Sequence, residues 1–172
     1  MDLEQLAIEI RSPIVRSLFD HWRVARGDRR VPVWRDIDAT RFAPALPLIS
    51  VWQVEPGGVL RGRLCGNETR YFFGHNIKGK TLDEVFPPVL VTELRTLLLD
   101  VVESRVILHM RTEMPNRMLE TVEYERISLP FSFDGSSCDG IISVRDGVGI
   151  VPIEQYNRDT AWTRTAENRV RL

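Results

Sequence analysis

The chain has 172 residues, which is enough for one domain that buries a core without help from disulfides or metals. Its 23 Lys and Arg residues balance 24 Asp and Glu residues to a formal charge of −1, which gives no overall field that favours nucleic acid or an anionic membrane. Residues 1–13 lack the basic and apolar regions of a signal peptide, and no stretch reaches the roughly 18 apolar residues of a membrane span, so we expect a cytoplasmic protein without a nucleic-acid partner and without membrane insertion.

The first predicted element is an amphipathic helix that follows Ser12 and ends at Gly27. Ser12 can cap the helix, Pro13 suits its first turn, and glycine commonly closes the last turn. An apolar stripe along this N-terminal region needs covering, so we predict a homodimer through it. The alternative is that the stripe folds back on the chain's own sheet. The stripe consists of Leu3, Leu6, Ile10, Ile14, Leu18 and Trp22.

Residues 29–47 carry three prolines and no sustained period, which predicts an extended, irregular arm anchored by Val33, Trp34 and Phe42. Two runs with strand character follow, at 48–54 and 59–65. The four residues between them are turn formers, so the two runs predict a hairpin.

Three helices are predicted after the hairpin. The first runs from Asn67 to Phe73 and is closed by Gly74, and the second follows Thr81, which can cap it. The third, in 88–105, repeats Leu and Val at helical spacing and forms a broad apolar stripe. A stripe of this width predicts that the helix lies on a sheet.

Three further strands are predicted at 106–113, 119–127 and 138–146. Apolar and polar residues alternate along the first two, so each is expected to show one face to water. Short connections require antiparallel pairing. The sequence therefore predicts an α+β fold with a five-stranded antiparallel sheet, helices on one face, and an N-terminal helix and arm before it. We divide the chain into helix and arm (1–45), core (46–150) and a polar tail (151–172) that forms a helix or stays disordered.

The element order and the stretch YFFGHNIKGKTLDEVFP at 71–87 resemble the PAS family of sensory domains. In this resemblance the two glycines turn the chain between short helices that wall a pocket against the sheet. A narrower resemblance is to a bacterial family of small, mostly stand-alone PAS proteins formerly catalogued as a domain of unknown function. Its signature covers roughly residues 12–146 and includes Trp22, Arg26-Gly27, Arg30, Pro32, Arg35-Asp36-Ile37-Asp38, Leu46-Pro47, Arg61, Arg63 and Gly66.

The resemblance implies a ligand pocket between sheet and helices. Aromatic residues fill cores by default, but a bound ligand is expected at Trp52, Tyr71, Phe72, Leu98, Val102 and Met110.

The cofactor is unknown, and neither haem nor flavin is expected. The flavin-binding PAS domains carry their reactive cysteine on the helix after the second strand, whereas Cys65 precedes Gly66. The haem-binding ones use a histidine on the long helix, where this chain has none. His75 and His109 are interpreted as loop or surface residues, and Cys65 and Cys138 as buried structural thiols. No metal site is predicted.

No catalytic motif is found, so we do not expect an enzyme; a small-molecule enzyme is the remotest alternative. The resemblance implies a stand-alone PAS-type sensory or regulatory module in bacterial signal transduction. Such a module binds a small-molecule ligand, a signalling protein that the sequence does not identify, or both. The nearest alternative is an interaction adaptor with a packed core and no ligand.

Overall fold

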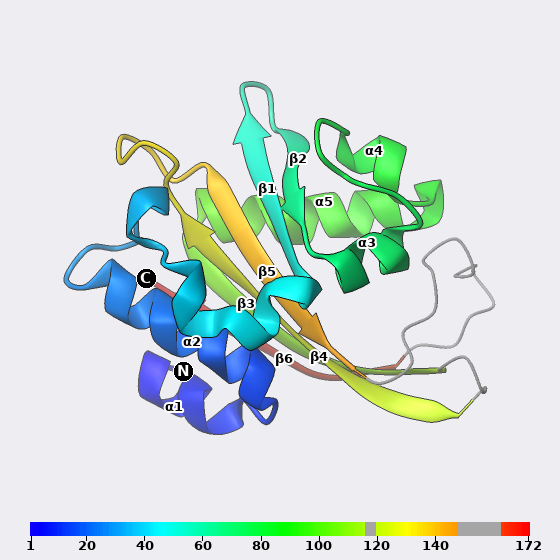
Figure 1. The fold of residues 1–172 in the computed structure, drawn as a ribbon, viewed down its shortest axis with the longest axis horizontal. Helices are drawn as coiled ribbons and strands as arrows, with labels where there is room; N and C mark the ends of the chain where they lie inside the picture. The colour runs from blue at the N-terminus through cyan, green and yellow to red at the C-terminus, as the bar shows by residue number, and fades with distance from the viewer. Residues whose placement is uncertain (116–119, 148–162) are drawn as a thin grey trace.

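The computed structural model describes residues 1–115, 120–147 and 163–172. A single antiparallel sheet lies between two layers of helices (Figure 1). Its six strands follow the order β2-β1-β5-β4-β3-β6, and every neighbouring pair is antiparallel. The strands are β1 (Ile49–Glu55), β2 (Val59–Cys65), β3 (Val106–Pro115), β4 (Thr121–Phe131), β5 (Gly140–Asp146) and β6 (Thr163–Arg171).

The predicted α+β fold with an antiparallel sheet is confirmed, and the sheet has a sixth strand. The tail was expected to be helical or disordered, but Thr163–Arg171 pairs with β3 along its length. Val170 is buried under the second helical layer, and Arg169 forms an ion pair with Asp100. Residues 151–162 of the predicted tail lie outside the described residues. The strand was missed because only Thr163, Thr165 and Val170 of its nine residues favour a strand by propensity, and the other six are charged residues, asparagine or alanine.

Three helices cover one face of the sheet, as predicted: α3 (Asn67–Phe73), α4 (Leu82–Val85) and α5 (Pro88–Glu103). Thr81 and Glu84 form a reciprocal capping box at α4. Gly74 and Gly79 have φ angles of 74° and 83°, which glycine adopts without strain. The two predicted glycine turns are therefore confirmed. None of the helices described is long and apolar enough to cross a membrane.

The other face of the sheet is covered by α1 (Leu3–Glu9) and α2 (Pro13–Arg26), a layer that the prediction of helices on one face did not include. The predicted limits of α2 are confirmed: the Ser12 hydroxyl accepts hydrogen bonds from two backbone N–H groups of its first turn, and Gly27 follows its last residue. On the side facing the sheet, Trp22 Nε1 donates to the Pro130 carbonyl at 2.8 Å.

The apolar stripe proposed as a dimer interface lies in this internal layer. Leu6, Leu18 and Trp22 are at most 1% exposed, because α1 and α2 pack on the chain's own sheet. The structure thus corrects the assignment of these side chains to an interface and matches the alternative of a stripe that folds back. A homodimer through another surface stays a prediction. The stripe is Leu3, Leu6, Ile10, Ile14, Leu18 and Trp22.

The arm was predicted to be extended, and this is wrong. It forms 3₁₀ turns instead, in η1 (Trp34–Asp36) and in η2 (Ala39–Leu48), which is divided by a kink at Phe42. Such short turns tolerate proline because few internal hydrogen bonds are lost. The predicted anchors are confirmed for Val33 and Phe42, which are 7% and 1% exposed.

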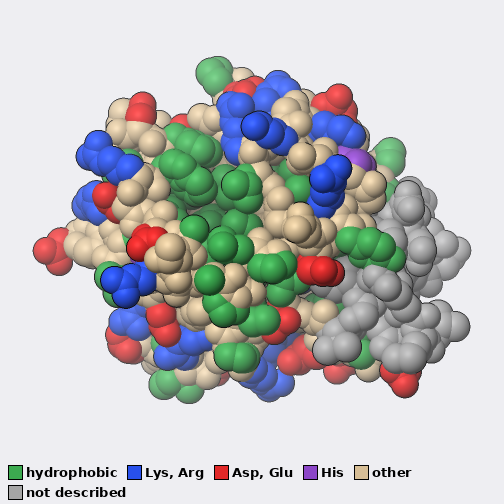
Figure 2. Space-filling view, viewed as in Figure 1, with side chains coloured by type: hydrophobic (Ala, Val, Ile, Leu, Met, Phe, Trp, Pro, Cys, Tyr) green, Lys and Arg blue, Asp and Glu red, His purple; other side chains and the backbone are tan. Residues whose placement is uncertain are grey.

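The surface on the side of the arm is mixed in charge. Figure 2 shows Lys and Arg interspersed with Asp and Glu around its rim, while hydrophobic side chains gather towards the middle, over β1, β5 and the arm. Two partly buried aromatic residues of this layer, Trp34 and Phe133, have ring centroids 5.9 Å apart.

Candidate functional site

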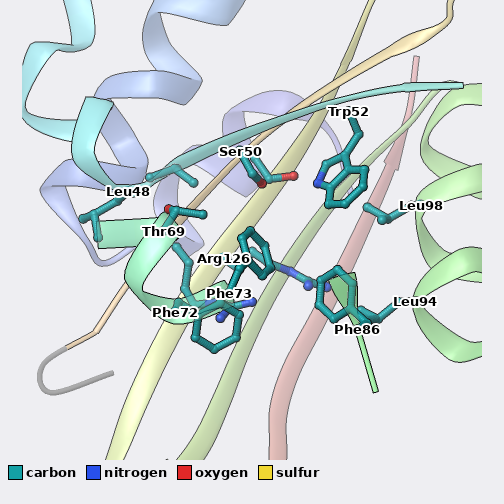
Figure 3. Close-up of a pocket in the computed structure, with 13 residues that line it drawn as sticks. Leu48, Ser50, Trp52, Thr69, Phe72, Phe73, Phe86, Leu94, Leu98 and Arg126 are labelled. Carbon is teal, nitrogen blue, oxygen red and sulfur yellow. The ribbon is translucent and has the colours of Figure 1, made fainter. Parts of the chain in front are cut away.

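A cavity of about 40 Å³, here called the central cavity, lies between the sheet and the layer of α3, α4 and α5 (Figure 3). Ser50 and Trp52 on β1, and Ser143 and Arg145 on β5, lie at alternate positions that face it, and α3 and α5 close it. It is lined by Leu48, Ser50, Trp52, Thr69, Phe72, Phe73, Phe86, Leu94, Leu98, Arg126, Ser143, Val144 and Arg145.

Aromatic rings form one wall of the central cavity. The ring of Phe73 packs edge-on against those of Trp52, Phe72 and Phe86, with centroids 6.4, 5.2 and 5.2 Å away. Edge-to-face packing at these distances is favourable beyond the area it buries. The wall is therefore preformed rather than assembled from loosely packed side chains.

The sheet side of the cavity carries a row of three serines. Ser50, Ser143 and Ser128 are register partners on β1, β5 and β4, and each is at most 8% exposed. Ser143 Oγ lies 2.9 Å from Ser128 Oγ, and Ser50 and Ser143 line the cavity. A buried serine row in an apolar core offers hydroxyl groups that can both donate and accept hydrogen bonds.

Two arginines lie next to this row. Arg126 and Arg145 are register partners on β4 and β5, and both line the central cavity. Figure 3 shows Arg126 extending from the sheet towards the aromatic wall. The guanidinium carbon of Arg145 is 3.8 Å from the ring centroid of Phe72, a cation–π contact. Burial lowers the pKa of Arg126 to about 10, and the nearby charge of Arg164 acts in the same direction.

The structure brings three of the predicted pocket residues together and separates the other three from the cavity. Trp52, Phe72 and Leu98 line it. Val102 and Met110 are buried in the same apolar cluster but do not line the cavity, and Tyr71 is 45% exposed on α3.

The sequence analysis missed the two arginines and the serines. Their signal was present, since Tyr124, Arg126 and Ser128 share one phase of β4, and Ile141, Ser143 and Arg145 share one phase of β5. In both strands that phase also carries residues of the apolar cluster under α5. Polar residues in the buried phase of a strand indicate a site, and this is the signal by which the sequence could have revealed them.

A second polar cluster lies on the opposite face, under α1 and α2. His109 is fully buried, and its Nε2 lies 2.7 Å from Glu125 Oε1. The interpretation of His109 as a surface residue is therefore wrong, because the N-terminal helices cover the face expected to meet water. The Glu125 carboxylate also accepts hydrogen bonds from the backbone N–H groups of Arg11 and Ser12, which join α1 to α2.

The pKa of Glu125 reflects two opposed influences. Burial alone would raise it, but the hydrogen bonds from His109 and from the backbone of Arg11 and Ser12 outweigh burial and lower the pKa below its usual value. The carboxylate is thus ionised at neutral pH and holds the junction of α1 and α2 against the sheet.

The remaining sequence candidates stay apart. The cysteines Cys65 and Cys138 are both free and partly buried, and burial raises the pKa of the Cys138 thiol to about 11. His21 Nε2 accepts a hydrogen bond from the backbone N–H of Asp38 in the arm. Neither residue lines the central cavity. Within the described ranges, no three His, Cys, Asp or Glu side chains gather as a metal site would require.

Comparisons with known proteins point to one family. A family model described as a PAS domain matches residues 10–143. Among solved structures, the PAS domain of BvgS from Bordetella pertussis is 21% identical, with a TM-score of 0.46 over 61% of this chain and 79% of that one. A PAS domain from Colwellia psychrerythraea is 10% identical, with a TM-score of 0.41 over 64% of this chain and 96% of that one. No curated protein matches the chain.

Proposed function

Because this chain belongs to the PAS domain family, we propose that it is a sensory or regulatory module of bacterial signal transduction, which binds a small ligand in the central cavity and acts by contact on a partner protein. One observation carries the ligand part of the proposal: polar side chains from three different strands converge on a cavity that is otherwise walled by aromatic and aliphatic groups. Cavities that bind small molecules combine a mostly apolar lining with a few such polar groups.

The small size of the cavity restricts the ligand. About 40 Å³ is far below the roughly 300–1,000 Å³ of sites that hold drug-sized molecules. The same observation supports the alternative function, an interaction adaptor whose core is packed and which holds no ligand. No catalytic role is part of either proposal.

The proposed partner contact uses surfaces other than the buried stripe. Ile8 on α1 and Val24 on α2 are 82% and 79% exposed, on the outer side of the N-terminal layer. We expect a homodimer to use this outer side. The hydrophobic middle of the face in Figure 2 is a second surface that a signalling protein could cover.

Thermal unfolding tests the ligand function. The probe is a filtrate of bacterial extract that contains only small molecules. We expect it to raise the melting temperature of the protein but not that of a Ser143→Leu variant, whose larger side chain fills the cavity. If the filtrate stabilises neither the wild type nor the variant, and the wild type still binds a partner protein, the result would favour the adaptor.

A further inference from the structure

We propose that the central cavity is a binding site for a short-chain carboxylate, held by the guanidinium groups of Arg126 and Arg145 beside the hydroxyls of Ser50 and Ser143. This inference rests on the proposed function and names the ligand class of its cavity. Four observations lead to it: the charge of the cavity, its hydrogen-bond donors, its volume and its lining.

The cavity concentrates positive charge. Arg126 and Arg145 stand directly opposite each other on an antiparallel strand pair, where like charges oppose folding. The carboxylates that act on Arg126 from a distance, Glu93 and Glu167, are both ion-paired with Arg164. These carboxylates share their charge with Arg164, so an anion beside the Arg126 guanidinium would compensate its charge more directly.

Arg126 has donors to spare. In the part of the chain that the structure describes, its guanidinium makes one hydrogen bond, from Nη2 to Met110 Sδ at 3.1 Å. A thioether sulfur is a weak acceptor, and guanidinium offers five N–H donors in a planar fork. That fork matches the two oxygens of a carboxylate better than it matches a spherical ion.

Volume and lining define the size and polarity of the ligand. A cavity of about 40 Å³ exceeds the roughly 10–15 Å³ that is needed to hold one water molecule and admits a ligand of only a few heavy atoms. Trp52, Phe86 and Leu98 line the cavity with apolar surface. This combination suits a carboxylate with a methyl or other very short alkyl group.

The test is an NMR titration with sodium acetate, which replaces sodium chloride at constant ionic strength. We expect saturable shifts at the amides of Ser143, Arg145 and Arg126. Acetamide, which has nearly the same shape and no charge, should give no saturable shift. Equal responses to acetate and acetamide, or none to acetate, would overturn the proposal.

Two arginine variants separate binding from structure. Arg126→Met removes the charge at similar length and should weaken acetate binding at least tenfold, whereas Arg63→Met, at an exposed arginine of β2, should leave it unchanged. In acetate-free buffer the Arg126→Met variant should resist urea at least as well as the wild type, because a buried like charge has gone. A large loss of stability together with unchanged acetate binding would show that Arg126 is purely structural and contradict the inference.

The outcome for acetate is independent of the proposed function. If the small-molecule filtrate stabilises the wild type but acetate does not bind, the carboxylate class is rejected and the sensory role remains. If neither binds, both are rejected in favour of the packed adaptor.

Discussion

The imidazole of His109 and the carboxylate of Glu125 are cross-strand neighbours on β3 and β4, 2.7 Å apart, in the interior beneath the N-terminal helices. This pair joins the sheet to the junction of α1 and α2, because Glu125 also accepts the backbone hydrogen bonds of Arg11 and Ser12. The central cavity lies on the opposite face of the sheet, where β4 contributes Arg126 to its lining. Strand β4 therefore connects the proposed ligand site to the helices that carry the exposed residues Ile8 and Val24.

Replacement of Glu125 by Gln should destabilise the protein by about 1–3 kcal/mol, because hydrogen bonds to a buried charged acceptor are lost or weakened. Urea denaturation measures the change. Glu123→Gln is the matched control: Glu123 lies two residues before Glu125 on β4 and pairs with Arg11 at the surface, so its loss should cost less than about 1 kcal/mol. Equal losses of unfolding free energy in the two variants would mean that the buried hydrogen bonds of Glu125 stabilise the protein no more than the surface ion pair of Glu123.

Stability should also depend on pH through Glu125. Its folded-state pKa lies below the reference value of 4.5, so its contribution is fully present above that pH and is lost as the pH falls through the folded-state pKa. Unfolding measured from pH 6 down to pH 3 should therefore show a steeper fall for the wild type than for Glu125→Gln. Parallel curves would contradict the assignment.

Leu18→Glu and Val24→Glu should behave differently although both lie on α2. Leu18 is 1% exposed in the internal layer, so a buried, unpaired carboxylate should unfold the protein or cost several kcal/mol. Val24 is 79% exposed, and its replacement should leave stability within about 0.5 kcal/mol. Light scattering on the folded Val24→Glu variant then tests the dimer: a dimeric wild type and a monomeric variant are expected. A wild type that is monomeric at high concentration would remove the homodimer from the proposal.

Gly62 on β2 is required by close packing. A Cβ atom there would lie 2.3 Å from the Ile77 carbonyl, in the loop between α3 and α4. Gly62→Ala should cost roughly 3 kcal/mol and move this loop away from the hairpin. Gly79→Ala is the comparison, because it meets no atom within 4 Å and should cost only the roughly 1–2 kcal/mol of its positive φ. Urea denaturation measures the stability of both variants. A Gly62→Ala variant as stable as the Gly79→Ala variant would contradict this account.

Local sequence signals predicted much of the fold. Ser12 and Gly27 defined α2, Thr81 defined the start of α4, and turn residues defined the β1–β2 hairpin. Each of these signals acts within a few residues, where backbone geometry and capping dominate. Trp52, in phase with the buried face of its strand, lines the cavity, and its contact with a ligand stays a prediction.

What was missed depends on contacts between distant segments. The burial of His109 follows from α1 and α2 covering the second face of the sheet, which the alternation of β3 does not reveal. Strand β6 pairs with the edge of β3, a contact between distant segments, although few of its own residues favour a strand. Arg126 was overlooked because burying a lone charge on an apolar face of a strand is unfavourable. Its position is explained by the cavity that it lines, which the sequence does not show.

The most direct test of the account is the electron density of the central cavity in crystals of the wild-type protein soaked in the small-molecule filtrate or in sodium acetate. We expect density for a small molecule within hydrogen-bonding distance of the Arg126 guanidinium, with the aromatic wall unchanged. A cavity closed by its own side chains in both soaks, with Arg126 turned away from it, would contradict the claim that this domain senses a ligand there.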